Sequence, residues 1–257
     1  MRPIKGGLVR ALLVLITVLV ICALWELVPS IGVVPTYLFP PPSKVGMTLI
    51  HLIVSGALIN EYVRTLVRVL IGFTLGTLVG LFVGIALSLK DLVRDVFYPI
   101  LAFLAVTPTV ALIPLLIVWV GINEFLPITA VFICSSIPVI YNTISGMRSV
   151  DPEMIGVAKT LGASTFKVIF TIMLPQALPS IFSALKIEAV MAWKTCFVAE
   201  MLVMSSGLGY LMIVAQSTLR VDVLIAALLV LSVSTYLFHL LFEKLELSVL
   251  RRWGLRG

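Results

Sequence analysis

Long apolar stretches alternate with short polar segments along this chain. Six stretches are long and apolar enough to be membrane helices, namely 8–28, 62–89, 97–121, 126–145, 177–204 and 223–242. A hydrocarbon core about 30 Å thick is crossed by about 20 helical residues, because only internally hydrogen-bonded backbone is stable there. The pattern therefore predicts an all-α polytopic membrane protein with six transmembrane helices and both termini on one side.

Composition and charge agree with this class. Apolar residues make up 61% of the chain and charged residues 12%, against roughly 25% charged in soluble domains. Most lysines and arginines fall at one set of span ends, from Arg2 and Lys5 to Arg251 and Arg252, and the positive-inside rule makes that side cytoplasmic. Both termini are therefore expected in the cytoplasm. No basic cluster suited to nucleic acid is present.

The segment between the first two spans is expected to lie outside the membrane. Met47, Ile50, Val54 and Leu58 recur on one helical face of residues 45–59, which are too few and too interrupted to cross a bilayer. This spacing predicts an interfacial helix on the outer surface. Residues 1–61 are thus expected to form a transmembrane helix followed by an external amphipathic segment.

Residues 151–175 form a more polar segment between two apolar spans. Asp151 and Pro152 are typical of an N-cap and the first helical position, and Gly162 of a C-cap. Ser164 can cap a second helix, which Pro175 is expected to end. Two capped helices outside the bilayer indicate a docking surface.

The same segment, residues 151–175, contains a motif that is typical of a known family. Ala158, Gly162, Ala163, Ser164 and the pair Leu174–Pro175 resemble the cytoplasmic coupling motif of permease subunits in ATP-binding-cassette (ABC) importers. Motifs elsewhere resemble the nitrate/sulfonate/taurine/bicarbonate branch of these permeases: 38–45, 68–73, 113–121, 142–152, Ala199–Glu200 and 207–209. The chain departs from the motif at Gly156, where the family has glutamate, and at Val157, where it has alanine.

The resemblance implies the type I ABC importer permease fold, with a transmembrane domain over residues 62–245 and a basic cytoplasmic tail over 246–257. It also implies partners: two ABC ATPase subunits that bind ATP and Mg²⁺, an extracytoplasmic substrate-binding protein, and a second permease copy, most simply an identical one. The expected location is the plasma membrane of a prokaryote, in contact with lipid. The residues expected to contact the ATPase are Met154, Val157, Ala158, Leu161, Gly162 and Ala163.

No enzyme motif is present in the chain. It contains no His-Glu-x-x-His, no nucleophile elbow and no phosphate-binding Gly-x-x-x-x-Gly-Lys-Ser/Thr loop. Cys22, Cys134 and Cys196 have no metal-type spacing and are typical of buried apolar residues. We therefore expect a non-catalytic transport subunit without metal or cofactor of its own.

Two groups of polar residues are candidates for the translocation pathway. Pro108 interrupts the third span between Thr107 and Thr109, whose hydroxyls could line a passage or bond their own helix. The fifth span carries Glu188, Lys194 and Glu200 beside Trp193. Intramembrane charges face protein or water. Lys194 could therefore attract an anion, or it could form an ion pair with Glu188 or Glu200.

The glycines of the second span recur every four residues, at Gly72, Gly76, Gly80 and Gly84. This spacing favours close packing of another helix. The cargo is left open between a nitrate-, sulfonate- or taurine-like anion and a pyrimidine or thiamine-precursor solute. An ion-coupled secondary transporter is a weaker alternative, because no inverted repeat is visible.

Overall fold

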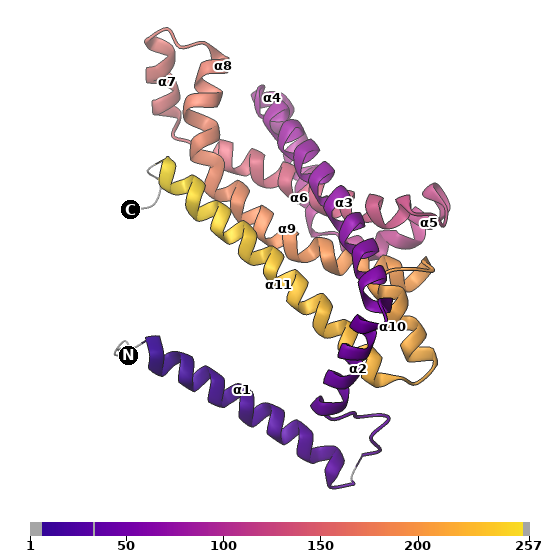
Figure 1. Cartoon of the computed structure of the whole chain (residues 1–257). Coiled ribbons are helices and arrows are strands. Elements are labelled where there is room, and N and C mark those ends of the chain that lie inside the picture. The colour runs from indigo at the N-terminus through magenta and orange to yellow at the C-terminus, as the bar shows by residue number, and fades with distance from the viewer. Residues whose placement is uncertain (1–6, 33, 254–257) are drawn as a thin grey trace. The chain divides into compact units, whose positions relative to one another are not determined.

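The structure is a computed structural model that describes residues 7–32 and 34–253, and all of its regular elements there are helical (Figure 1). The chain termini expected in the cytoplasm lie outside the described residues. The helices are α1 (Gly7–Ser30), α2 (Pro42–Val54), α3 (Ala57–Ser88), α4 (Asp91–Val106), η1 (Thr109–Leu112), α5 (Ile113–Val120), α6 (Phe125–Arg148), α7 (Pro152–Thr160), α8 (Thr165–Val168), η2 (Ile169–Met173), α9 (Leu174–Val203), α10 (Leu208–Ser217) and α11 (Val221–Arg252).

Five helical runs in the described ranges are long and apolar enough to cross a membrane, and a bent pair makes a sixth. The runs contain α1, α3, α6, α9 and α11, which correspond to five of the six predicted spans. The third span is the bent pair: α4 and the helical turns after Pro108 meet at an angle of 90°, at an interruption that the sequence indicated.

The break in the third span has a local cause. Proline disfavours the helical conformation of the residue before it and cannot donate a backbone hydrogen bond. Thr107, which precedes Pro108, is extended with φ −70° and ψ 126°. Pro108 is extended as well, at φ −62° and ψ 111°, and the short helix η1 starts directly after it. Pro99 and Pro138 lie inside α4 and α6 without ending them.

The chain divides into two compact units. The first comprises Met1–Glu61 and Leu211–Val230. Within it, Glu26 at the end of α1 accepts hydrogen bonds from the backbone N–H and the hydroxyl of Ser43 on α2, at 3.1 and 2.7 Å. Thr48 donates to Asp222 at 2.8 Å. Met47, Ile50 and Val54 of the predicted face are exposed, whereas Leu58 is buried.

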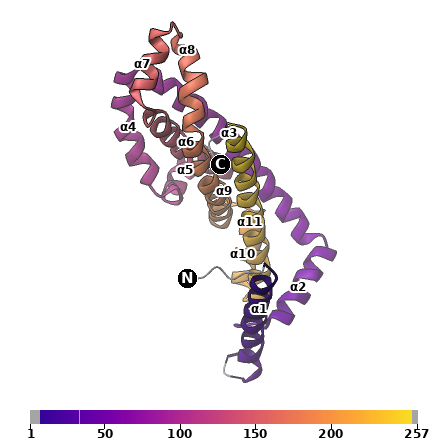
Figure 2. The same cartoon turned by 90° about the vertical axis from the view of Figure 1, so that its left-hand side faces the viewer.

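The second unit comprises Tyr62–Tyr210 and Leu231–Gly257, and its core lies along α6. The glycine stripe of α3 packs on that helix. A Cβ at Gly76 would lie 2.6 Å from the carbonyl oxygen of Phe132, and one at Gly72 would lie 2.7 Å from that of Ile128. Near the C-terminal end of α6, Gly146 lies against Ala177 of α9. Figure 2 shows α3, α6 and α9 close together in this unit. The packing role predicted for the stripe is confirmed.

The helices α7 and α8 form a hairpin at one end of the second unit (Figure 1). The second helix of this hairpin does not end at Pro175, as the sequence predicted. Residues Thr165–Val203 form one continuous helical run of 39 residues. The π-helical turn η2 (Ile169–Met173) immediately precedes the N-terminal turn of α9, in which Pro175 lies. Within a membrane helix a proline leaves a carbonyl without its usual partner, and a local π adjustment such as η2 lets the freed backbone groups find other partners.

Candidate functional site

The hairpin α7–α8 is fixed by caps at the positions that the sequence indicated. The Asp151 side chain accepts a hydrogen bond from the backbone N–H of Glu153 at 2.9 Å, with Pro152 at the first position of α7. At the other end, Gly162 has φ +81°, a conformation that glycine adopts without strain. Its N–H donates to the Lys159 carbonyl at 2.9 Å. The Ala163 N–H donates to the Ala158 carbonyl at 3.0 Å. Together these bonds make a Schellman motif.

The second helix of the hairpin starts at the predicted cap. The Ser164 hydroxyl accepts from the backbone N–H of Lys167 at 3.3 Å, and α8 begins at Thr165. Phe166 and Phe170 lie one turn apart on this arm, with ring centroids separated by 4.4 Å. Both ends of the turn between α7 and α8 are thus held by short-range hydrogen bonds.

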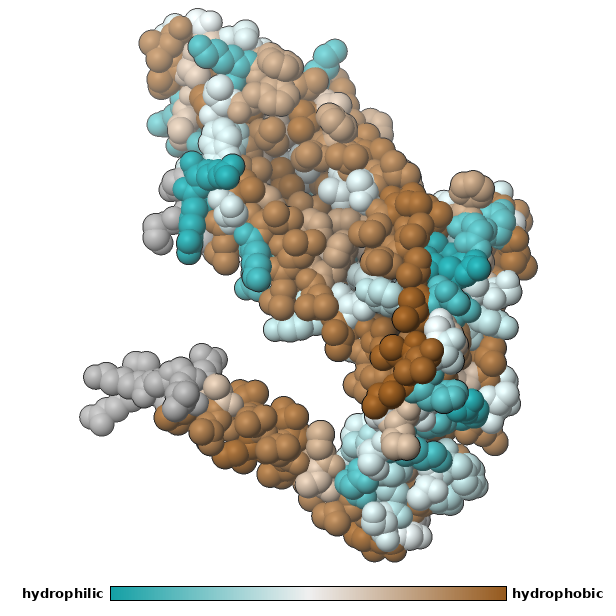
Figure 3. Space-filling model, viewed as in Figure 1, coloured by the Kyte–Doolittle hydropathy of each residue, from teal (hydrophilic) through white to brown (hydrophobic). Residues whose placement is uncertain are grey.

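Large apolar side chains of the hairpin are exposed. Val157 is 61% exposed and Leu161 is 82% exposed, and Met154 and Phe166 are exposed as well. No atom lies within 4 Å of a Cβ built at Gly156 or Gly162, whereas Ala158 and Ala163 are half-buried. Figure 3 shows hydrophobic and hydrophilic residues mixed at this end of the unit. Exposed apolar side chains on a polar, capped element indicate a surface that a partner covers.

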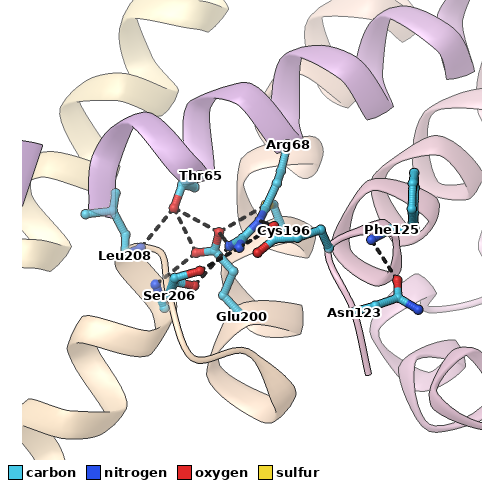
Figure 4. A network of polar contacts seen from close by, with 10 residues as sticks. Thr65, Arg68, Asn123, Phe125, Cys196, Glu200, Ser206 and Leu208 are labelled. Atoms are coloured by element: carbon cyan, nitrogen blue, oxygen red, sulfur yellow. Dashed lines mark hydrogen bonds and ion pairs between the residues drawn. The ribbon is translucent and has the colours of Figure 1, made fainter. Parts of the chain in front are cut away.

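A second cluster of polar residues is buried around Glu200 near the end of α9 (Figure 4). Its carboxylate accepts from the Thr65 hydroxyl at 2.8 Å, from Arg68 Nη1 at 2.7 Å and from the Gly209 N–H at 3.0 Å. The Thr65 hydroxyl in turn accepts from the Leu208 N–H at 2.9 Å. Residues from α3, α9 and the start of α10 therefore meet at one buried carboxylate.

Arg68 is the centre of this cluster, and it is 2% exposed. Its Nε and Nη2 donate to Glu124 at 2.8 and 2.6 Å. Its Nη1 and Nη2 also donate to the backbone carbonyl and the hydroxyl of Ser206, at 2.9 and 2.7 Å. With the bond to Glu200, these contacts match the five N–H donors of a guanidinium group.

The backbone of Gly207 packs directly against the Glu200 carboxyl group. Its φ is +106°, and a Cβ at this position would collide with the Glu200 carboxyl group. The family motifs that were separate in the sequence, at Arg68, Glu200 and Gly207, thus lie in one network. Its carboxylate and guanidinium groups are hydrogen-bonded, so the geometry suits a tether between helices better than a reactive centre.

The pathway candidates of the third span lie at the break in it. The Thr107 hydroxyl donates to the Phe103 carbonyl of its own helix at 3.1 Å. Pro108 is exposed and Thr109 is half-buried. The break therefore presents a proline and partly accessible hydroxyl groups on the surface of the described chain.

The candidates of the fifth span separate onto different faces of α9. Lys194 is exposed on the same face as Ile187 and Met191, and it forms no ion pair with any residue that the structure describes. Trp193 is 1% exposed, stacked on Tyr62 and edge-on to Phe238. Glu188 is buried and accepts a hydrogen bond from the Cys134 thiol at 3.5 Å. The alternative ion pairs of Lys194 with Glu188 or Glu200 are not formed.

The structure also shows polar partners that sequence reasoning missed. Lys186 of α9 and Glu246 of α11 form an ion pair of 2.6 Å, with Glu246 buried. Glu124 and Ser206 were not recognised as partners of Arg68, although Arg68 was in a family motif. Such pairs join residues 56 to 138 positions apart. Hydropathy and residue spacing are local patterns, so they do not predict contacts between residues so far apart in the sequence.

The sequence matches a known family over most of its length. Residues 76–250 match the family described as binding-protein-dependent transport system inner membrane component. The taurine transport system permease protein of Escherichia coli strain K12 is 29% identical over 235 residues, covering 90% of this chain and 86% of that protein. A putative aliphatic sulfonates transport permease of Bacillus subtilis is 30% identical over 232 residues, covering 90% and 84%.

Solved structures agree on the fold. An inward-facing methionine ABC transporter structure has a TM-score of 0.61 at 20% identity, covering 72% of this chain and 93% of that chain. An amino acid ABC transporter structure has a TM-score of 0.60 at 22% identity, covering 79% and 97%. The fold is thus that of type I importer permeases. The chain belongs to the binding-protein-dependent inner membrane components, and it is a multi-pass, non-catalytic permease subunit of an ABC transporter.

Proposed function

We propose that this chain forms the translocation pathway for a small organic anion of the sulfonate class, which an extracytoplasmic binding protein delivers. The observation that carries the proposal is the similarity, over 90% of the chain, to permeases named for taurine and for aliphatic sulfonates. A sulfonate is a compact, permanently charged group. The pathway for it needs a fixed positive charge and hydrogen-bond donors, since an uncompensated charge is costly in the membrane.

The hairpin α7–α8 supplies the energy coupling in this proposal. Met154, Val157 and Leu161 present apolar surface next to Ala158, Gly162 and Ala163, where the backbone is accessible. Covering apolar surface contributes about 25 cal/mol per Å². We therefore assign this face to a groove on the ATPase, with one ATPase on each of two identical permease copies.

Lys194 is the group that would attract the anion. Its side chain is exposed on α9 and free of a carboxylate partner among the described residues. A second copy of the chain against this face would leave the ammonium group in a narrow passage of low dielectric, where its field is strong. Thr107, Pro108 and Thr109 at the break in the third span would line another part of that passage. Trp193 and Glu200 support α9 from the packed side.

The test is uptake by proteoliposomes that contain the permease, its ATPase and its binding protein. Taurine, an alkanesulfonate, a pyrimidine thiamine precursor and nitrate are each offered separately in labelled form. We expect uptake of a sulfonate that requires ATP and both partner proteins. Uptake that persists without the ATPase would indicate a secondary transporter. Uptake of the pyrimidine alone would contradict the sulfonate assignment and leave the permease role intact.

The same assay tests Lys194. We expect Lys194→Met to reduce sulfonate uptake at least about tenfold, because a charge-assisted hydrogen bond contributes about 1.5–3 kcal/mol. Lys194→Arg keeps the charge and should retain most of the activity, and ATPase association should be unchanged in both variants. Normal uptake by Lys194→Met would exclude Lys194 from the pathway.

A further inference from the structure

A cavity of about 440 Å³ lies beside the hairpin, between the start of α4, the end of α6 and the two arms of the hairpin. This volume falls in the range of small-molecule sites. The lining includes Asp91, Arg94, Arg148, Lys159 and Thr165, and every residue of it belongs to the second unit.

The charged side chains that line this cavity are mostly cationic: Arg94, Arg148 and Lys159 oppose the single carboxylate of Asp91. Arg94 is already paired, with Asp91 at 2.8 Å and with Asp95 at 3.3 Å. In the described part of the chain, no carboxylate lies within ion-pair distance of Arg148 or Lys159. The nearby Asp151 carboxylate is engaged as the N-cap of α7. Two positive charges at the cavity are therefore left without an anion.

Arg148 is held in place by an aromatic partner. Its guanidinium carbon lies 5.3 Å from the centroid of the Tyr98 ring. The Tyr98 hydroxyl donates to that of Tyr141 at 2.9 Å. Stacking on a ring face orients a guanidinium group without using its N–H donors. A positioned arginine with free donors is the group that binds planar or tetrahedral oxyanions best.

We propose that this cavity binds an oxyanion, the phosphate or sulfonate group of a small solute or of an anionic lipid, through Arg148 and Lys159. Because Arg148 belongs to α6 and Lys159 to α7, a bound anion would bridge the membrane core of the unit and the coupling hairpin. The site is separate from the transport pathway proposed above, and it does not depend on which solute is carried.

The test uses Thr165, which lines the cavity and is exposed. Thr165→Cys is introduced into the complex with its ATPase, in a background without Cys22, Cys134 and Cys196, in phosphatidylcholine nanodiscs. A sulfonate-bearing thiol reagent should react at least about tenfold faster than a cationic reagent of equal size. Arg148→Gln should remove this preference, whereas Lys90→Gln, a nearby cation outside the cavity lining, should keep it.

Protection from labelling then identifies the source of the anion. If inorganic phosphate or methanesulfonate slows the labelling in phosphatidylcholine nanodiscs, the ligand of the cavity is a free anion. If labelling is slowed only when the nanodiscs contain phosphatidylglycerol, the ligand is a lipid headgroup. Three outcomes would each overturn the proposal. The two reagents could react at equal rates, no anion could slow the reaction, or the bound ATPase could prevent all labelling of the Thr165→Cys variant. Failure of sulfonate uptake would contradict the proposed cargo without affecting this result.

Discussion

The hairpin α7–α8 and the network around Glu200 belong to the same unit and use polar groups in opposite ways. In the hairpin, side chains bond to backbone groups two or three residues away, and the apolar side chains are exposed. In the network, most hydrogen bonds join residues 56 to 143 positions apart, and both Arg68 and Glu200 are buried. The hairpin is locally folded and exposes apolar side chains, whereas the network joins helices within the unit.

This difference predicts different costs of mutation. Removal of one member of a buried ion pair leaves the other charge buried without a partner, which is severe for folding. Loss of an exposed apolar side chain leaves folding nearly unchanged and weakens whatever contact it makes with a partner. Three variants test these expectations, from the largest effect to the smallest.

The largest effect is expected for Arg68→Ala. The Glu200 carboxylate would lose its cation while remaining 0% exposed. Breaking a buried pair in this way costs about 3–5 kcal/mol. Thermal unfolding of the detergent-purified permease, with its yield from the membrane, measures the effect.

Glu124→Gln is the matched control for this variant. Glu124 binds the same guanidinium group at 2.6 Å, but its side chain is 59% exposed. Exposed pairs contribute about 0–1 kcal/mol, so this variant should keep nearly normal stability. Equal losses for Arg68→Ala and Glu124→Gln would show that burial does not set the importance of these bonds.

An intermediate effect is expected for Leu161→Gln, and on association instead of folding. The side chain is 82% exposed in the isolated permease. Burying a leucine contributes about 1.5–3 kcal/mol, so the variant should bind the ATPase at least about tenfold more weakly. Affinity for the ATPase in detergent is the measurement, with unfolding recorded in parallel. Glu153→Gln, a polar change on the same helix, should leave the affinity nearly unchanged. An unaltered affinity of Leu161→Gln would remove Leu161 from the contact.

The smallest effect is expected for Asp151→Ala. The variant removes the acceptor for the Glu153 N–H, and loss of an N-cap costs about 0.5–2 kcal/mol. Because the bond is local, we expect faster amide hydrogen exchange over residues 153–156 and unchanged exchange around Arg68 and Glu200. Asp151→Asn keeps an acceptor and should restore the protection. Faster exchange throughout the unit would show that the hairpin is not locally stabilised.

The sequence predicted the hairpin well and the network only in part, for the same physical reason. Asp151, Gly162 and Ser164 act on backbone groups within a few residues, so their positions alone predict the caps. Arg68, Glu200 and Gly207 could be placed in family motifs, but hydropathy and spacing do not reveal which distant side chains meet. Nothing in the sequence linked Lys186 to Glu246.

Two prolines have different effects on their helices, and only the effect of Pro175 was wrongly predicted. Pro108 ends a helical run, because the residue before it is extended, whereas Pro175 lies inside one, because a π turn precedes it. The residue type is the same in both cases. Its effect depends on whether neighbouring backbone groups find other partners, which only the folded structure determines.

The uninterrupted run from Thr165 to Val203 has a mechanical consequence. At 1.5 Å per residue, its 39 residues make a rod about 58 Å long. The α8 end of this rod lies in the hairpin, and Glu200 lies three residues from the other end. A displacement of the hairpin along this axis would therefore reach the Arg68–Glu200 tether only as far as the irregular turn η2 keeps its shape.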